Sequence, residues 1–349
     1  MERTKRAEPL SSQMKRRANS VKETKSEYDG DFGSSISTGS TLLDLAISGG
    51  RVKGGGLPGG ILVEAFGPSG SGKTVLLSEI AGGVQRQHGQ IMFHDPEARL
   101  NKTFAKLFDL NTDEMEYGNP NTVPEVFQAV RKWEPQGKKV IHGIFADSLA
   151  ALSTDMEMEK DEGDKMGIRR AKEFSEELRR TCRVITEKNY LMVCSNQVRV
   201  NVDAGPYGQK YTTPGGEAIG FYSSLRLRFS RPEKIKEKQR IAGKEVTRVK
   251  GVRVVIEVFK SSIWKPFGTA PVTILFDYGI DDIRENLQFI KDFTKNTIYT
   301  CCGTPLDKSM EVSIDMVESS KWENNLKEEV IELWEEIESK FKTERKPKR

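Results

Sequence analysis

The stretch Gly67-Pro68-Ser69-Gly70-Ser71-Gly72-Lys73-Thr74 decides the fold of this chain. It fits the pattern G-x-x-x-x-G-K-[ST], in which glycine lets several backbone N–H groups approach a phosphate group closely. The apolar run 61–67 predicts a buried β-strand, and the residues from Val75 onward predict a helix whose N-terminus adds partial positive charge. Strand, loop and helix in this order predict a nucleotide-binding site rather than an accidental glycine-rich turn.

Individual side chains of this region have predicted roles toward a nucleoside triphosphate and Mg²⁺. Lys73 is expected to reach the β- and γ-phosphates, and the Thr74 hydroxyl to occupy one position around the ion. A second apolar run, 140–148, ends at Asp147, where phosphate-loop ATPases carry the acid that holds the ion through water. The loop residues predicted to contact the nucleotide are Gly67, Pro68, Ser69, Gly70, Ser71, Gly72, Lys73, Thr74 and Val75.

Length and composition limit the class of protein. At 349 residues, with 36% hydrophobic and 30% charged residues, the chain can form one large α/β core with smaller appendages. No stretch approaches about 18 consecutive apolar residues, so no membrane-spanning helix is predicted. The basic N-terminus lacks the apolar segment of a signal peptide, which predicts a cytoplasmic location.

The cysteines and histidines show no metal-binding spacing. Cys182, Cys194, Cys301 and Cys302 form no C-x-x-C or histidine-paired motif, and the three histidines are scattered. We therefore expect four reduced thiols, with a redox switch at the adjacent Cys301 and Cys302 as the alternative.

Basic residues gather at both ends of the chain, although the net charge is only +4. Residues 1–25 hold eight Lys or Arg against three Glu, and residues 342–349 hold five against one. Such arms suit a polyanionic partner, although solvated tails that bind nothing specific would look the same.

Apolar periodicity predicts an α/β fold with a mostly parallel sheet and helices on both faces. The expected strands are 61–67, 91–94, 140–148, 191–197, 224–229, 248–260 and 271–277. The expected helices lie within 35–46, 75–81, 103–108, 123–133, 168–185, 283–293 and 321–341. We expect a basic N-terminal arm at 1–33, an ATPase core at 34–282, and a small C-terminal α/β domain with a basic tail at 283–349.

Two segments without periodicity interrupt the core. Residues 155–167 are charged and contain glycine, and residues 198–216 are rich in glycine and proline. Loops this long inside a compact domain are more often functional than not. Arginines on the helix after the first loop fit either a binding surface or a solvated face.

The order of several motifs resembles the RecA-type recombinases of bacteria and their phages, from about residue 35 to residue 280. The matching segments are 37–46, 56–60, the phosphate loop, Phe93-x-Asp95-x-Glu97, 147–152, Asn196-Gln197-x-Arg199, 212–216, 218–226 and Lys260-x-x-Ile263-x-x-Pro266-Phe267. Each motif is moderately specific, and their order and spacing together are highly specific.

The resemblance implies roles at matched positions. Glu97 is similar to the general base that orients the attacking water, and Gln197 to the residue that senses the γ-phosphate. Lys260 is similar to a lysine that reaches the γ-phosphate bound by the neighbouring subunit. Phe104 holds the position of an aromatic that covers the adenine, and Phe221 that of an aromatic that couples adjacent subunits.

The same resemblance implies an ATP- and Mg²⁺-dependent, DNA-stimulated ATPase that assembles into helical filaments on single-stranded DNA. It would pair that strand with homologous double-stranded DNA and exchange strands, in the cytoplasm of a prokaryote or a phage-infected cell. Loops 155–167 and 198–216 are similar to the two loops that face the filament axis. The residues expected to contact DNA are Met166, Arg169, Arg170, Arg199, Val202, Thr213, Gly215 and Gly216.

Two alternatives remain open at this point. One is a ring-forming motor with the same core, such as a hexameric helicase. The other is a filament protein that coats DNA without hydrolysing ATP. The complete set of Lys73, Glu97, Asp147 and Gln197 argues against the second.

The chain departs from the family pattern at several positions. A second inter-subunit lysine is replaced by Ser262, for which Lys265 is a candidate substitute, and another is replaced by Gly220. Bacterial members often end in an acidic stretch that competes with DNA, whereas this tail is basic. We therefore expect DNA loading to be less autoinhibited here.

Overall fold

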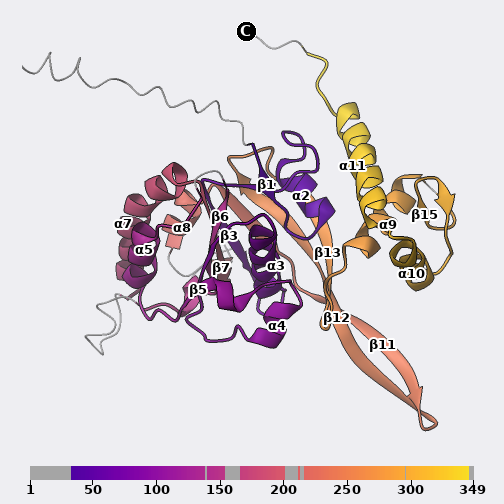
Figure 1. The fold of residues 1–349 in the computed structure, drawn as a ribbon, viewed down its shortest axis with the longest axis horizontal. Helices are drawn as coiled ribbons and strands as arrows, with labels where there is room; N and C mark the ends of the chain where they lie inside the picture. Colours follow the sequence, from indigo (N-terminus) through magenta and orange to yellow (C-terminus); the bar gives the residue numbers. More distant parts are fainter. Residues whose placement is uncertain are drawn as a thin grey trace, which may run out of the picture. The chain divides into compact units, whose positions relative to one another are not determined.

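The computed structural model describes residues 33–137, 140–153, 166–200, 211–212, 216–294 and 296–345 (Figure 1). Met1–Gly33 and Ser34–Arg349 separate into two units, and the elements below belong to the second. Because the described residues begin at Gly33, the rest of the predicted N-terminal arm, 1–32, lies outside them.

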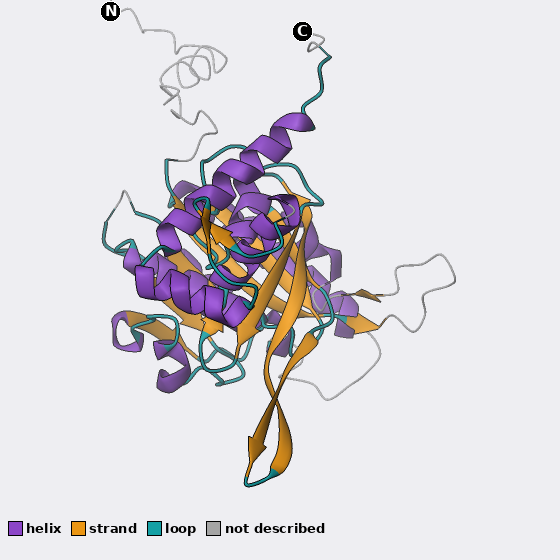
Figure 2. Ribbon diagram, turned by 90° about the vertical axis from the view of Figure 1, so that its right-hand side faces the viewer, coloured by secondary structure: helices purple, strands orange, loops and turns teal. Residues whose placement is uncertain are grey.

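A ten-stranded sheet forms the centre of the fold (Figure 2). In spatial order its strands are β14 (Gly279–Ile280), β13 (Thr269–Leu275), β12 (Lys244–Ser261), β10 (Leu225–Phe229), β3 (Ile61–Gly67), β7 (Tyr190–Gln197), β6 (His142–Ala146), β4 (Ile91–His94) and β5 (Met115–Gly118), with β11 (Glu233–Ile241) beside β12. Pairing is parallel from β10 to β5 and antiparallel from β10 to β14. The α/β class predicted from the sequence is confirmed, with an antiparallel part added at one end.

Helices cover both faces of the parallel part (Figure 1). Alternation along β6 shows which helix meets which face, because successive strand residues point in opposite directions. Ile144 packs in one apolar cluster with Phe127 of α5 (Val123–Lys132) and Phe174 of α7 (Met166–Glu187). At Gly143 a Cβ atom would lie 3.1 Å from Val84 of α3 (Lys73–Arg86), on the opposite face. α8 (Gly216–Tyr222) packs against α7.

Short elements precede the phosphate loop and follow β4. β1 (Ser35–Ile36) pairs with β2 (Leu57–Pro58), and α2 (Thr41–Ser48) lies between them in the chain. Ser40 caps α2, as the Ser/Thr-rich sequence before it predicts. After β4 come α4 (Lys102–Lys106) and a short 3₁₀ turn, Thr112–Glu114. A second 3₁₀ turn, Leu149–Ala151, follows β6.

The C-terminal elements pack onto the core. They are α9 (Asp282–Thr294), β15 (Thr300–Cys301), β16 (Thr304–Pro305), α10 (Met310–Ser320) and α11 (Glu323–Lys340). The Asp282 carboxylate accepts hydrogen bonds from the Thr41 N–H and hydroxyl, both at 2.7 Å, so α9 is tied to the start of α2. The division into domains at residues 282 and 283 stays a prediction.

Strands β11 and β12 form a hairpin that extends from the sheet (Figure 2). The sequence predicted only residues 248–260 of it. Its turn holds Ala242 and Gly243 at φ of 48° and 80°, the left-handed conformation that two-residue hairpin turns require. The charged run of β11 is weakly strand-forming by itself, and its pairing with β12 stabilises it.

The two predicted loops are only partly described. Helix α7 begins at Met166, inside the first predicted loop, whose residues 155–165 lie outside the described part of the chain. In the second, β8 (Arg199–Val200) pairs with β9 (Tyr211–Thr212), so its ends form a short ladder that the sequence did not predict. Among the described residues, no helix is both long enough and apolar enough to span a membrane.

Candidate nucleotide site and inter-subunit surface

The residues predicted to contact the nucleotide meet at one edge of the sheet, the one formed by the carboxyl ends of its parallel strands. In the parallel ladders Gly67 lies beside Gln197, and His94 beside Ala146. The Asp147 N–H donates to the His94 carbonyl oxygen at 3.0 Å, and the Val198 N–H to that of Gly67 at 3.3 Å. The phosphate loop, Asp147 and Gln197 therefore share the carboxyl ends of adjacent strands, where α/β folds bind ligands.

The phosphate loop curls around the Lys73 side chain. Lys73 is largely buried, and its Nζ donates to the carbonyl oxygens of Pro68 at 2.7 Å and Gly67 at 3.1 Å. Gly70 and Gly72 have φ of 71° and 87°, and a Cβ at Gly70 would meet nothing within 4 Å. Burial lowers the pKa of Lys73, and the nearby Asp147 and Glu97 carboxylates act in the opposite direction.

Asp147 lies beside the first residues of α3. Its carboxylate accepts hydrogen bonds from the Ser195 and Thr74 hydroxyls, and burial raises its pKa despite them. A hydroxyl and a carboxylate side by side supply the hard oxygen ligands that Mg²⁺ prefers, so these residues fit a magnesium ion. Ser195 was not predicted, because nothing distinguishes it from the other polar residues at the end of β7.

Glu97 is held from both sides. Its Oε1 accepts from the Ser148 hydroxyl at 3.0 Å, and its Oε2 lies 2.6 Å from Nη2 of Arg99. Only 17% of its side chain is exposed. Because Ser148 directly follows Asp147, the two acids are linked through neighbouring residues, and the orientation of Glu97 depends on the end of β6.

A buried network lies behind Gln197. Glu64 on β3 is fully buried and accepts from Arg226 Nε at 2.6 Å and Asn196 Nδ2 at 2.9 Å. Asn196 in turn accepts from the Gln197 N–H at 3.0 Å. A buried carboxylate is tolerated when it is paired and hydrogen-bonded. Glu64 was not predicted, although a single charged residue in an otherwise apolar strand was the available signal.

Lys260 and Phe221 occupy one patch at the end of α8. The Lys260 Nζ donates to the carbonyl oxygens of Gly220 and Phe221, both at 2.9 Å. Burial lowers the pKa of Lys260, and the Arg226 guanidinium lowers it further. The Phe221 side chain is 76% exposed, with its ring edge-on to Tyr222. Aromatic residues are enriched in protein interfaces, so an exposed ring here is compatible with the inter-subunit role predicted for Phe221.

Comparison with known proteins identifies the family. Residues 19–281 match the model of the RecA N-terminal domain. The chain belongs to the RecA family. Protein RecA of Anaplasma marginale (strain Florida) is 35% identical over 252 residues, which are 72% of this chain and 66% of that protein. Protein RecA of Colwellia psychrerythraea (strain 34H) is 35% identical over 254 residues, covering 72% and 69%. Protein RecA of Campylobacter jejuni subsp. doylei is 32% identical over 255 residues, covering 73% and 70%.

The chain thus spans about two thirds of the length of the RecA relatives it matches. Membership of the RecA family brings nucleotide binding with it, in agreement with the loop at residues 67–74. The roles of single residues in this RecA-family site stay predictions.

Two other predicted site residues, Phe104 and Arg170, contact neighbouring parts of the same chain. Phe104 on α4 is half-buried, and its ring centroid lies 5.0 Å from that of Phe108. Arg170 donates through Nη2 to the carbonyl oxygens of Leu149 at 3.0 Å and Ala150 at 2.9 Å, so it links α7 to the turn after Asp147. This contact leaves its predicted role in DNA binding untested.

Only the backbone is described for Met166 and Arg169 at the start of α7, Arg199 in β8 and Gly216 at the start of α8. Val202, Thr213 and Gly215 lie outside the described residues.

Two residues connected with the departures from the RecA pattern, Gly220 and Lys265, have close neighbours in the structure. At Gly220 a Cβ would lie 2.9 Å from Nη1 of Arg226, so a larger residue would press on this arginine. Lys265, the candidate substitute at the Ser262 position, lies 3.4 Å from the Glu338 carboxylate on α11. In this single chain Lys265 is therefore engaged with the C-terminal helix.

The β11–β12 hairpin is a basic surface that the sequence analysis missed. Residues 233–250 hold seven Lys or Arg against three Glu. All seven basic side chains are exposed, and Lys238 and Lys250 form ion pairs with glutamates of the same hairpin. Two sequence signals could have indicated this hairpin: the alternation of charged residues in 233–241 and the Ala-Gly pair at 242–243.

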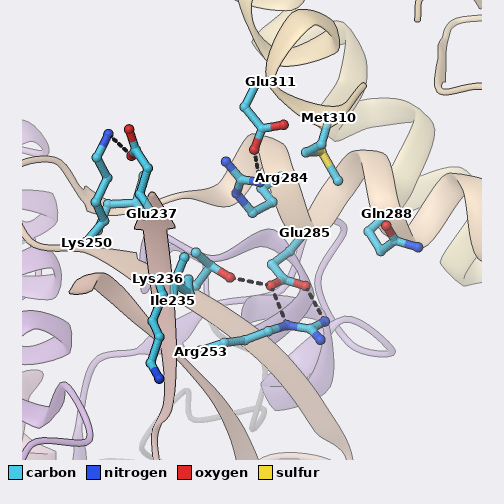
Figure 3. A pocket seen from close by; sticks show the side chains of 12 residues that line it. Ile235, Lys236, Glu237, Lys250, Arg253, Arg284, Glu285, Gln288, Met310 and Glu311 are labelled. Carbon is cyan, nitrogen blue, oxygen red and sulfur yellow. Dashed lines mark hydrogen bonds and ion pairs between the residues drawn. The ribbon is translucent and has the colours of Figure 1, made fainter. Parts of the chain in front are cut away.

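A pocket of about 700 Å³ lies between the base of this hairpin and helices α9 and α10 (Figure 3). Arg253 donates to both Glu285 carboxylate oxygens at 3.0 Å, and Thr273 adds a third hydrogen bond at 2.7 Å. Arg284 pairs with Glu311 at 3.2 Å. The Arg253–Glu285 pair therefore links β12, at the base of the hairpin, to α9, and the Arg284–Glu311 pair links α9 to α10.

Proposed function

We propose that this RecA-family chain is an ATP- and Mg²⁺-dependent recombinase. It polymerises on single-stranded DNA, pairs that strand with homologous double-stranded DNA and exchanges strands, in the cytoplasm of a prokaryote or phage-infected cell. The observation that carries this proposal is the meeting of Lys73, Thr74, Glu97 and Asp147 with Gln197 at one sheet edge. A single-stranded partner suits the two glycine-containing segments that leave this edge.

The first part of the proposal concerns the nucleotide and uses side chains that already lie close to one another. Lys73 would exchange the carbonyl oxygens of its own loop for phosphate oxygens, which relieves the burial of an ammonium group among neutral acceptors. Thr74 and Asp147 would hold Mg²⁺, which neutralises phosphate charge when bound. Glu97, with its orientation set by Ser148, would accept a proton from the attacking water.

Coupling between nucleotide and DNA would pass through Gln197. This residue ends β7 beside Gly67, and β8 begins two residues later. If Gln197 changes conformation when it contacts a γ-phosphate, this change would therefore act directly on the segment 198–216. The Glu64, Arg226 and Asn196 network holds the strand behind Gln197 in place, so that the change is confined to the loop side.

The filament part of the proposal rests on the patch at the end of α8. Phe221 would insert into the adjacent subunit, and Lys260 would leave its carbonyl partners to meet the γ-phosphate bound there. A cation delivered by a neighbour in this way makes hydrolysis depend on assembly. ATP would thus lie between subunits, and its hydrolysis would weaken both the interface and the grip on DNA.

Charge supports DNA as the partner. The basic segments 1–25 and 342–349 and the exposed lysines and arginines of the hairpin would all attract a polyanion. We assign 1–33 to polymerisation or DNA contact, 34–282 to the ATPase core, and 283–349 to a small domain that contributes basic surface.

A DNA-stimulated ATPase assay and electron microscopy with an ATP analogue and single-stranded DNA test this proposal. We expect hydrolysis that requires DNA, and helical filaments rather than hexameric rings. Lys73→Ala should abolish hydrolysis, while Lys340→Ala, an exposed lysine paired with Glu336, should not. Closed rings would favour the motor, and filaments without hydrolysis would favour the DNA-coating protein.

A further inference from the structure

Two adjacent thiols and one carboxylate converge in the C-terminal elements, away from the nucleotide residues in the sequence. Cys301 ends β15 and is fully buried, and Cys302 occupies the turn before β16 and is exposed. The third group is Glu329, one helical turn after Asn325 on α11. The two sulfur atoms and a Glu329 oxygen all lie within 4.8 Å of one another.

The backbone holds this arrangement in three ways. Cys302 and Gly303 have φ of 50° and 72°, which turns the chain sharply between β15 and β16. The Cys302 N–H donates to the Glu329 carboxylate at 2.6 Å, and its thiol lies 3.6 Å from the Asn325 carbonyl oxygen. The three side chains are therefore brought together by elements that are already folded.

We propose that Cys301, Cys302 and Glu329 form a binding site for a thiophilic divalent cation, for which Zn²⁺ is the natural candidate. Zn²⁺ takes sulfur at about 2.3 Å and carboxylate oxygen at about 2.0–2.2 Å, so in a tetrahedral set two sulfur ligands lie about 3.8 Å apart and a sulfur and an oxygen about 3.6 Å apart. The three ligand atoms lie within 4.8 Å of one another, so they must approach by up to about 1 Å to reach these separations. Water completes a tetrahedral set. Two thiolates disfavour Mg²⁺ and Ca²⁺, which select oxygen ligands.

Binding involves no redox step. Each thiol gives up its proton to solvent, two Zn–S bonds and one Zn–O bond form, and the ion loses the corresponding water ligands. Exposure of Cys302 supplies the entry path, while burial of Cys301 removes competing water. The ion would fasten the β15–β16 turn to α11, and it would stabilise these elements by mass action. The site does not depend on the proposed recombinase activity.

The test uses the full-length reduced chain, freed of metal. Zn²⁺ is titrated in competition with a chromophoric chelator in the presence of excess Mg²⁺, and Cd²⁺ is titrated while thiolate-to-metal absorption is followed. We expect one ion per chain, with Mg²⁺ having no effect. Cys302→Ser removes an exposed ligand and should weaken binding by more than the roughly 10- to 100-fold typical of losing an outer-shell partner.

Two further variants separate the ligands from the rest of the chain. Glu329→Gln keeps both thiolates, so the Cd²⁺ absorption should reach the wild-type value at higher metal concentration. Cys182→Ser, a half-buried cysteine on α7, should bind as wild type. Thermal melts without metal check that every variant is folded. Equal Zn²⁺ affinity in wild type and folded Cys302→Ser, or no Zn²⁺ bound by wild type, would overturn the proposal.

Discussion

The Lys260 Nζ lies 2.9 Å from the carbonyl oxygen of Phe221, so the two residues with predicted inter-subunit roles share a direct contact. Lys260 thereby caps the end of α8 in the single chain, and its ammonium group is partly withdrawn from water. A neighbour that binds Phe221 would disturb this contact. We therefore propose that assembly and release of Lys260 toward a neighbour's γ-phosphate are coupled through its hydrogen bonds to the Gly220 and Phe221 carbonyl oxygens.

This coupling predicts the effect of Lys260→Ala. Loss of a cation at the γ-phosphate should lower the DNA-stimulated hydrolysis rate on the order of 10³-fold, while affinity for ATP changes little. The control is Lys53→Ala, which removes an exposed lysine paired with Glu328. Steady-state hydrolysis and nucleotide binding are measured in parallel. An equal loss in both variants would argue that the total positive charge matters rather than Lys260 itself.

The hairpin predicts a change in duplex binding. Substituting Lys234 and Lys244 with Gln removes two exposed charges outside the core, so the fold should persist. Affinity for double-stranded DNA should fall, and the slope of log affinity against log salt should decrease by about one for each phosphate group that the variant no longer neutralises. The control variant has Gln at the exposed Lys132 and Lys308, so its total charge equals that of the hairpin variant while the hairpin is unchanged. The same decrease in that control would exclude a specific role for the hairpin.

Stability should depend on pH through Asp44 of α2. Its buried carboxylate accepts from the Thr38 N–H at 2.8 Å and the Thr38 hydroxyl at 2.7 Å, yet burial raises its pKa to about 6. A raised folded-state pKa means that the native state binds the extra proton. The resulting stabilisation is complete below the unfolded pKa, about 4, and disappears as pH rises through about 6.

Relative to Asp44→Asn, the wild-type chain should therefore lose roughly 1 kcal/mol of unfolding free energy between about pH 5 and about pH 7. Urea denaturation at the two pH values measures this difference, with the exposed Asp277→Asn as control. If the unfolding free energy of wild type instead increases relative to that of Asp44→Asn as pH rises, the hydrogen bonds to the Asp44 carboxylate lower its pKa by more than burial raises it.

The basic tail predicts an effect on DNA loading. Removing residues 342–349 takes away five basic residues and one Glu, so affinity for single-stranded DNA should fall and its salt dependence should flatten. A tail of equal length made of Gly and Ser separates charge from length. Faster filament nucleation after deletion would show that this tail inhibits loading, as the acidic tails of bacterial members do.

Much of the fold was predictable because its core elements are long and strongly patterned. Strand β3 and the phosphate loop appear at the expected residues, and β4, β6 and β7 follow within two residues at each end; α3 begins two residues before the predicted stretch 75–81 and ends five residues after it. Their parallel order then brings Lys73, Asp147 and Gln197 to one edge. Local sequence patterns determine such elements, and topology determines where their ends meet.

What could not be predicted depends on contacts between distant residues. The run 233–241 becomes a strand only by pairing with β12, and Ser195 matters only because Asp147 lies beside it. The spacing of the cysteines gave no sign of a third ligand, since Glu329 lies 27 residues from Cys302 on a separate helix. Likewise, no pattern shows that Lys260 donates to the carbonyl oxygen of Phe221.

D-loop formation tests the central claim most directly. Wild-type protein, ATP, Mg²⁺, a labelled single strand and homologous supercoiled duplex should yield joint molecules, and a heterologous duplex should yield none. Lys73→Ala should yield none either, because the triphosphate is no longer held. Glu97→Gln should still pair the strands while hydrolysis falls about 10²- to 10⁴-fold, since it retains binding and loses the general base. Joint molecules with wild type that require both homology and Lys73 are the predicted result; their absence with folded, ATP-binding wild-type protein would contradict the assignment as a recombinase.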